Sequence, residues 1–297
     1  MIHRLMFVAF ASLVAMPESL SAQGGTDIWV APFSDIAGRV SVGRPVNVTR
    51  RAGYDNQPAF TPDGSTILFT STRGDGQADI WRVPVTGGAH VRVTKSDPES
   101  EYSATPMPGQ DGFSAIRVER DSTQRLWRFN YDGSGAALVL RALRPVGYHV
   151  WIGDATLGTF VLSSPPGSRS PNALVLVDPR TERADTLARG IGRALVRVPG
   201  RDAFTFLQEG RDTSWISEVD VRTKAVRRVA PSPVGSDYHL WTPNGQLVAS
   251  VGTGLLIRVG DRWDVLADFA ELGVKDVSRL ALSPRGDRIA FVAADRP

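Results

Sequence analysis

Two copies of one short pattern hold the side chains best able to do chemistry in this sequence. The segments Tyr148-His149-Val150-Trp151 and Tyr238-His239-Leu240-Trp241 share the form Tyr-His-x-Trp. Imidazole is a common metal ligand and proton carrier, and a phenol both donates and accepts hydrogen bonds. Such a pair of segments could form a binding site, hold a metal ion, or serve packing alone.

Polar residues also stand at the positions that align with the two tyrosines elsewhere in the chain. An alignment on the aromatic residues Phe60, Trp151 and Trp241 gives Gln57, Thr105, Arg193 and Arg279 as these equivalents. Polar groups that converge on one opening are typical of a binding site. We therefore expect a ligand site made of Gln57, Tyr148, His149, Arg193, Tyr238, His239 and Arg279.

Three interpretations of the histidines stay open at this point. The imidazoles could bond to neighbouring backbone. Alternatively, the polar residues around the opening could recognise an anionic or peptide ligand through Arg193 and Arg279. A metal site built on His149 and His239 would need a third ligand. The carboxylates close enough in sequence to supply it are Asp55, Glu101 and Asp237. Nothing in the pattern selects one of them, so we expect no metal and no other cofactor.

The elements that must position these residues are short strands arranged in a repeat. The clearest unit runs from Tyr54 to Thr94 and has four apolar runs separated by three turns, which predicts an antiparallel meander. Pro62 and Gly64 suit the first turn, Thr-Pro-Asp-Gly. Related turns recur at 109–112, 199–202, 242–245 and 283–286. The third-strand residues that align with Trp81 follow at steps of 46, 48, 42 and 40 residues, at Trp127, Val175, Ser217 and Ile257. These steps are close to the roughly 40–45 residues of a four-stranded propeller blade.

The two ends of the chain complement each other. Residues 27–32 nearly copy the third-strand segment 79–84, and residues 279–293 supply a first and a second strand. Pairing the ends would close a ring and remove exposed edges. The sequence predicts an all-β fold, a six-bladed β-propeller of four-stranded antiparallel blades with the last blade closed by N- and C-terminal strands. We expect one domain over 26–297, with blades at 52–95, 98–141, 145–190, 191–230 and 235–270, and the last blade built from 26–50 and 275–297.

These motifs resemble the repeats of the TolB-like propeller family, also described as PD40 or WD40-like repeats. That repeat carries a Ser/Thr-Pro-Asp-Gly turn, an Asp-Ile-Trp/Tyr strand and an Arg-Leu-Thr-like end, here Arg92-Val93-Thr94. The resemblance implies a propeller that binds protein partners in the periplasm. TolB proper has an additional N-terminal domain, whereas here the expected propeller begins within a few residues of the signal, so we do not extend the resemblance to a Tol–Pal role. Similar propellers form the non-catalytic part of prolyl-oligopeptidase-like peptidases and the whole of some metal-dependent oligogalacturonate lyases.

Composition and missing motifs exclude several functions. The chain has 34 basic and 31 acidic residues without a concentrated basic stripe, so we expect no nucleic-acid partner. It has no cysteine, which excludes disulfides and thiolate chemistry. The sequence also contains no Gly-x-Ser-x-Gly elbow, His-Glu-x-x-His motif, P-loop or dinucleotide motif.

The N-terminal segment is typical of a secretory signal. His3 and Arg4 precede an apolar or small run over 5–16, which Pro17 ends before small residues at 19–22. The run is too short to span a bilayer, which needs about 20 residues. We expect residues 1–22 to be a signal peptide and the protein to be exported, periplasmic or secreted, without a membrane span.

The function predicted from these observations is a non-catalytic exported scaffold. It would act as a monomer and bind a protein or peptide partner at the channel face. The alternative is an enzyme, a metal-dependent lyase or hydrolase that acts on acidic oligosaccharides through the central channel.

Overall fold

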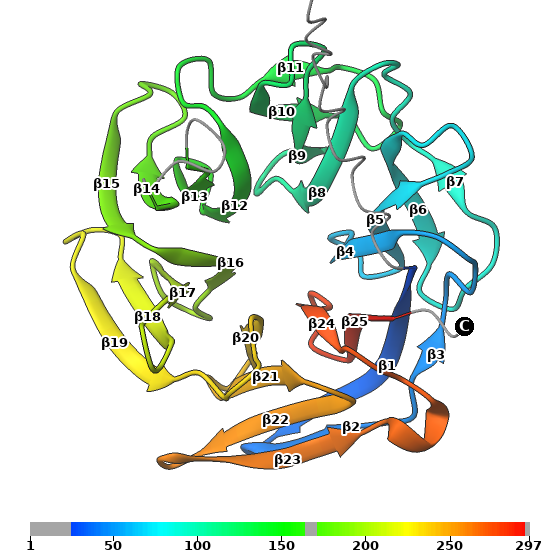
Figure 1. Ribbon diagram of the computed structural model, residues 1–297, viewed down its shortest axis with the longest axis vertical. Coiled ribbons are helices and arrows are strands. Elements are labelled where there is room, and N and C mark those ends of the chain that lie inside the picture. The colour runs from blue at the N-terminus through cyan, green and yellow to red at the C-terminus, as the bar shows by residue number, and fades with distance from the viewer. Residues whose placement is uncertain (1–24, 164–170, 295–297) are drawn as a thin grey trace, which may run out of the picture.

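Six antiparallel sheets are arranged radially around a common axis (Figure 1). The computed structural model describes residues 25–163 and 171–294, so the expected signal segment 1–22 lies outside the described residues. Within those ranges the structure has no α-helix, and a single 3-10 helix, η1, spans Ala270–Leu272. The all-β, six-bladed prediction is confirmed.

The first three blades follow one another along the chain. Blade 1 consists of β4 (Asp55–Phe60), β5 (Thr66–Thr72), β6 (Ala78–Pro84) and β7 (Val91–Arg92). Blade 2 consists of β8 (Ser100–Pro106), β9 (Phe113–Val118), β10 (Gln124–Phe129) and β11 (Ala137–Leu138). Blade 3 consists of β12 (Val146–Ile152), β13 (Thr156–Val161), β14 (Ala173–Val177) and β15 (Ala184–Arg189).

The remaining blades complete the ring. Blade 4 consists of β16 (Ile191–Arg197), β17 (Ala203–Gln208), β18 (Trp215–Asp220) and β19 (Val226–Pro231). Blade 5 consists of β20 (His239–Trp241), β21 (Leu247–Val251), β22 (Gly254–Val259) and β23 (Arg262–Asp268). The closing blade combines β24 (Ser278–Leu282) and β25 (Arg288–Ala294) with β1 (Thr26–Ile36), β2 (Arg39–Val42) and β3 (Val46–Asn47).

The chain ends meet in the closing blade as the repeat predicts. β1 pairs antiparallel with β25, and the register runs from Thr26 opposite Ala294 to Pro32 opposite Arg288. We call the paired strands β1 and β25 the seam. Its side chains pack onto blade 1, where Ile28 joins Phe60 and Phe69 in one buried cluster. Burying a side chain of this size contributes about 1.5–3 kcal/mol. The seam is therefore held both by strand pairing and by apolar packing.

A threonine hydroxyl explains why Asp-Ile-Trp and the distant Val-Thr occur together in the repeat. Thr94 Oγ1 donates to the Asp79 carboxylate at 3.3 Å and accepts from the Ile80 backbone N–H at 2.9 Å. In the closing blade Thr49 makes the same two bonds, to Asp27 and from Ile28. The hydroxyl attaches the end of the fourth strand to the third, where the short ladder of β3 or β7 has already ended.

One part of the closing blade differs from the sequence prediction. Only a third and a fourth strand were expected in residues 26–50. Instead β1 continues past Pro32 and forms a hairpin with β2, and the fourth strand is the short β3. We call residues 33–42 the latch hairpin. It lies against β23 of blade 5, so the insertion reaches across to the neighbouring blade (Figure 1).

Candidate functional site

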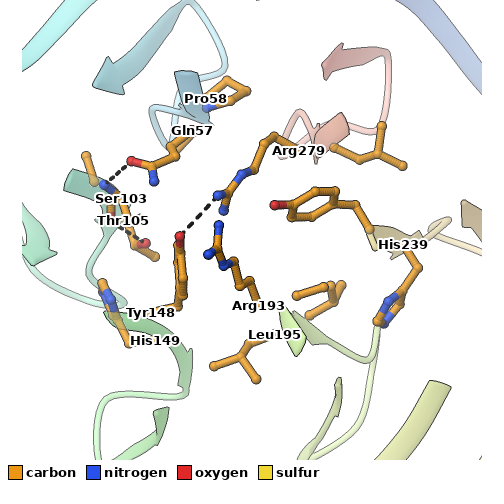
Figure 2. Close-up of a pocket in the computed structure, with 16 residues that line it drawn as sticks. Gln57, Pro58, Ser103, Thr105, Tyr148, His149, Arg193, Leu195, His239 and Arg279 are labelled. Carbon is orange, nitrogen blue, oxygen red and sulfur yellow. Dashed lines mark hydrogen bonds between the residues drawn. The ribbon is translucent and has the colours of Figure 1, made fainter. Parts of the chain in front are cut away.

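The first strands of the six blades face the axis, and their starts surround a cavity of about 170 Å³. All the residues predicted from the sequence line it, and Ser103, Thr105 and Leu195 line it as well. The lining residues come from every blade, and Tyr148, Arg193 and Arg279 point toward one another (Figure 2). The structure thus brings the predicted ring together at one mouth of the propeller.

Three of the first strands enter the cavity in an unusual backbone conformation. Gln57, Ser103 and Arg279 have φ values of 58°, 57° and 52°, in the left-handed region that favours glycine. Each lies where the pairing of its strand shifts register. Such irregularities turn a side chain away from its regular direction and cost about 1–3 kcal/mol each. Here they direct polar side chains to the axis.

Ser103 corrects one residue of the sequence alignment. Thr105 was predicted as the equivalent of Gln57 in blade 2, but the strand register makes Ser103 the equivalent residue. Its backbone N–H donates to Gln57 Oε1 at 2.9 Å, and Thr70 Oγ1 donates to the same oxygen at 2.8 Å. Gln57 therefore joins blades 1 and 2, and its acceptor atom is already occupied.

Arg279 is the centre of the charged half of the cavity. Its guanidinium donates to the Tyr148 hydroxyl at 3.1 Å, and its central carbon lies 5.0 Å from the Tyr148 ring centroid and 4.7 Å from that of Tyr238. Cation–π contacts of this kind orient an arginine without neutralising it. Burial raises the pKa of Tyr238, so that phenol stays protonated near neutral pH.

The positive charge of this half has no acidic partner. Arg193 is exposed, and its guanidinium lies beside that of Arg279 (Figure 2). None of the ion pairs found within residues 25–163 and 171–294 includes either arginine. Two adjacent cations that lack a carboxylate attract an anion.

The histidines serve contacts between blades. His149 Nε2 lies 2.6 Å from Ser114 Oγ of blade 2, and the Trp151 indole donates to the same oxygen at 2.8 Å. In the second copy His239 Nε2 lies 2.8 Å from Thr205 Oγ1 of blade 4, and the Trp241 indole donates to it at 3.0 Å. We call each set a hydroxyl clamp. The expected backbone bonds are thus not what the Nε2 atoms make, since each lies next to a side-chain hydroxyl of the neighbouring blade.

Both clamps keep their imidazoles neutral. Burial lowers the pKa of His149 to about 3 and that of His239 to about 4. Protonation would place a charge in a site that offers no acidic partner, which desolvation disfavours. Near neutral pH neither histidine changes its protonation state.

The residues present do not fit a metal ion. Both Nε2 atoms are engaged in clamps, and His149 and His239 lie on opposite sides of the cavity (Figure 2). Asp55 is bound by Ser71 and Arg51, and Glu101 by Ser96 and Arg117. Among the described residues no group of three His, Cys, Asp or Glu side chains could hold an ion.

Comparison with known proteins gives few sequence relatives and many structural ones. No protein-family model matches the chain. A stretch of 83 residues is 32% identical to an uncharacterized protein of Agrobacterium fabrum, and the match spans 28% of this chain and only 27% of that protein.

Solved structures match over nearly the whole chain. A TolB-type protein from Agrobacterium tumefaciens has 16% identity and a TM-score of 0.66, over 92% of this chain and 99% of that one. A gluconolactonase from Xanthomonas campestris has 13% identity and a TM-score of 0.62, over 89% and 95%. An oligogalacturonate lyase in complex with manganese has 13% identity and a TM-score of 0.52, over 93% and 98%. Binding proteins and enzymes share this architecture, so the likeness defines the fold and leaves the activity open. The chain has the six-bladed β-propeller fold, and its architecture is similar to that of the TolB-type protein.

Proposed function

We propose that this propeller is a non-catalytic binding protein that takes up an anionic group of a protein or peptide partner at the channel mouth. The observation that carries the proposal is the pair Arg193 and Arg279, which point into an open cavity without an acidic counter-charge. Tyr148 and Tyr238 hold Arg279 in place before any ligand arrives. A preorganised cation loses little entropy on binding, which favours recognition.

The protonation states in the cavity favour binding over catalysis. General acid–base catalysis works best with a group whose pKa lies near the working pH. Burial moves the pKa values of the two histidines down and that of Tyr238 up, away from neutrality in both cases. The alternative function, a metal-dependent lyase or hydrolase, needs a ligand set that the described residues do not supply.

The proposed place of action is outside the cytoplasm. The proposal rests on the signal-like segment that starts with His3 and Arg4. In the part of the chain that the structure describes, no helix has the length and apolar character needed to cross a membrane. Mass spectrometry of the protein purified from its host tests export, with a mature N-terminus expected near Gln23.

A charge reversal on an exposed arginine tests the binding function. Arg193→Glu changes the cavity, whereas Arg197→Glu changes another exposed arginine of β16 that does not line the cavity. We expect the native protein and Arg197→Glu to retain the same partner from a native cell-envelope extract, and Arg193→Glu to lose it. Retention by all three proteins, or by none, would contradict the proposal.

A further inference from the structure

We infer that the group held in the channel mouth is the free C-terminal carboxylate of a peptide whose last side chain is small and apolar. The inference rests on the proposed function and names the ligand class of the same site. It follows from three features of the cavity: its hydrogen-bonding inventory, its apolar wall and its size.

The charged half of the cavity offers more hydrogen-bond donors than free acceptors. Arg193 and Arg279 only donate, and the acceptor oxygen of Gln57 is already used by Thr70 and Ser103. The Tyr148 hydroxyl accepts from Arg279. A carboxylate offers only acceptors and matches the planar fork of a guanidinium. Sugar hydroxyls need acceptors as well as donors, so this wall suits a saccharide less.

Two polar atoms in the wall lack a partner. Ser103 Oγ and His149 Nδ1 are buried, and the described residues offer neither a hydrogen bond. His149 is only 7% exposed, yet it lines the cavity. Buried polar groups are nearly always hydrogen-bonded in folded proteins. Their unused hydrogen-bonding capacity in this wall is a second sign that a polar ligand completes it.

Another part of the wall is apolar. Pro58, Ala104, Ala194, Leu195, Val196 and Leu280 line the cavity together with the charged residues. A terminal residue carries its carboxylate and its side chain on the same carbon atom. It can therefore place the charge against Arg193 and Arg279 and the side chain against this apolar surface.

The cavity is open on one side and has room for about one residue inside it. Its volume of about 170 Å³ is close to the roughly 150 Å³ of a protein cavity that holds one benzene molecule. An internal acidic residue would bring two flanking chain segments to the same opening. A chain end brings one, which is why the terminal carboxylate fits better than an Asp or Glu side chain.

Small probes can separate these alternatives in an NMR titration of the full protein. The probes are N-acetyl-glycyl-valine as the free acid, the same compound as the amide, N-acetyl-aspartyl-glycine amide, galacturonate and inorganic phosphate. We expect the free acid to bind at least tenfold more tightly than each of the others. Arg193→Gln should weaken its binding at least tenfold, and the matched variant Arg197→Gln should leave it unchanged.

Any other outcome overturns the inference. The proposed function is tested separately, by the retention of a partner from the envelope extract. Equal binding of the aspartyl amide would indicate a side-chain carboxylate, which keeps an anionic peptide as the ligand. Tighter binding of galacturonate or phosphate would assign the site to a different ligand class. If no probe binds while Arg193→Glu still loses the partner from the envelope extract, the terminal carboxylate is wrong and the binding function stands.

Discussion

The hydroxyl clamp gives the repeated Tyr-His-x-Trp pattern its physical meaning. A histidine and a tryptophan two residues apart lie on the same face of a strand, because side chains alternate along it. Both reach one hydroxyl on the second strand of the preceding blade, Ser114 in one copy and Thr205 in the other. The intervening first-strand residue points the other way. The tyrosine one position earlier remains free to face the axis.

Removing the hydroxyl of one clamp should destabilise the protein without changing its shape. Thr205→Val keeps the volume but leaves the His239 and Trp241 nitrogens buried without their shared oxygen, so we expect a loss of about 1–3 kcal/mol in unfolding free energy. Thr205→Ser keeps the oxygen, as Ser114 does, and should cost only about 0.8 kcal/mol for the lost methyl. Urea denaturation compares the two. A valine variant as stable as the parent would refute the clamp.

The two neutral histidines should make stability depend on pH below neutrality. Their pKa values are about 3 and about 4 when folded, and about 6.5 when unfolded. Below pH 6.5 the unfolded chain therefore binds more protons, and stability falls as the pH is lowered toward the folded values.

The expected slope is about 1.4 kcal/mol per pH unit for each histidine. Unfolding free energies between pH 6 and pH 5 measure it, in the parent and in a variant with His149→Gln and His239→Gln. The variant should lose less stability over this interval, because its side chains do not titrate there. Parallel curves would show that these histidines are not buried in the neutral form.

At the scale of residues, the sequence could predict which side chains meet but not how they are used. Alignment of the repeats placed Gln57, Tyr148, Arg193 and Arg279 around one opening, because equivalent positions of a closed ring are neighbours. It missed Ser103, since a register shift inside a strand leaves no mark in residue types. The left-handed backbone of Gln57 and Arg279 has no glycine or asparagine to signal it.

At the scale of elements, the latch hairpin is an addition to the propeller repeat. Its tip is fixed to the first turn of blade 5. Asn244 donates to the two Asp35 carboxylate oxygens, from its backbone N–H and from its side chain, both at 2.9 Å. Burial acts to raise the pKa of Asp35, but hydrogen bonds from Thr242 and Asn244 outweigh it and lower the pKa. The sequence did not predict this hairpin as an addition to the repeat. Its residues alternate like those of any exposed strand pair, so the pattern does not distinguish them from the expected third and fourth strands.

Removing either side chain of the contact between Asp35 and Asn244 should lower the unfolding free energy only slightly. The losses of the two single variants should not add in the double variant. We expect Asp35→Ala and Asn244→Ala each to lower the unfolding free energy by about 1 kcal/mol, because the bonds are partly exposed to solvent. The double variant should lose no more than either single variant, since all these bonds join the same two residues. Additive losses in thermal or urea unfolding would mean that the two residues act independently.

At the scale of the whole molecule, ring closure was the most predictable feature. Half-blades at the two ends of the chain can bury their strand edges only by pairing with each other. This requirement predicts the partner of β1, and together with the five complete repeats it gives six blades. The same reasoning gives no ligand, because the fold serves both binding proteins and enzymes.

A disulfide across the seam should stabilise the closed ring. The chain has no cysteine, and Thr26 lies opposite Ala294 in the seam, so Thr26→Cys combined with Ala294→Cys gives a single bond that closes nearly the whole chain. We expect the oxidised form to be about 2–4 kcal/mol more stable than the reduced form of the same variant, because the unfolded chain loses entropy. The single variant Thr26→Cys should show no response to reductant. Equal stability of both redox forms would contradict the pairing at this end of the seam.

The pairing of β1 with β25 also sets an order of events in time. A ribosome makes β1 first and β25 last, so the earliest strand must wait for almost the entire remaining chain before it finds its partner. The other five blades each consist of consecutive strands and can pair as they are made, whereas the closing blade cannot. A nascent chain interrupted before Arg288 therefore leaves one edge of β1 unpaired and open to other chains.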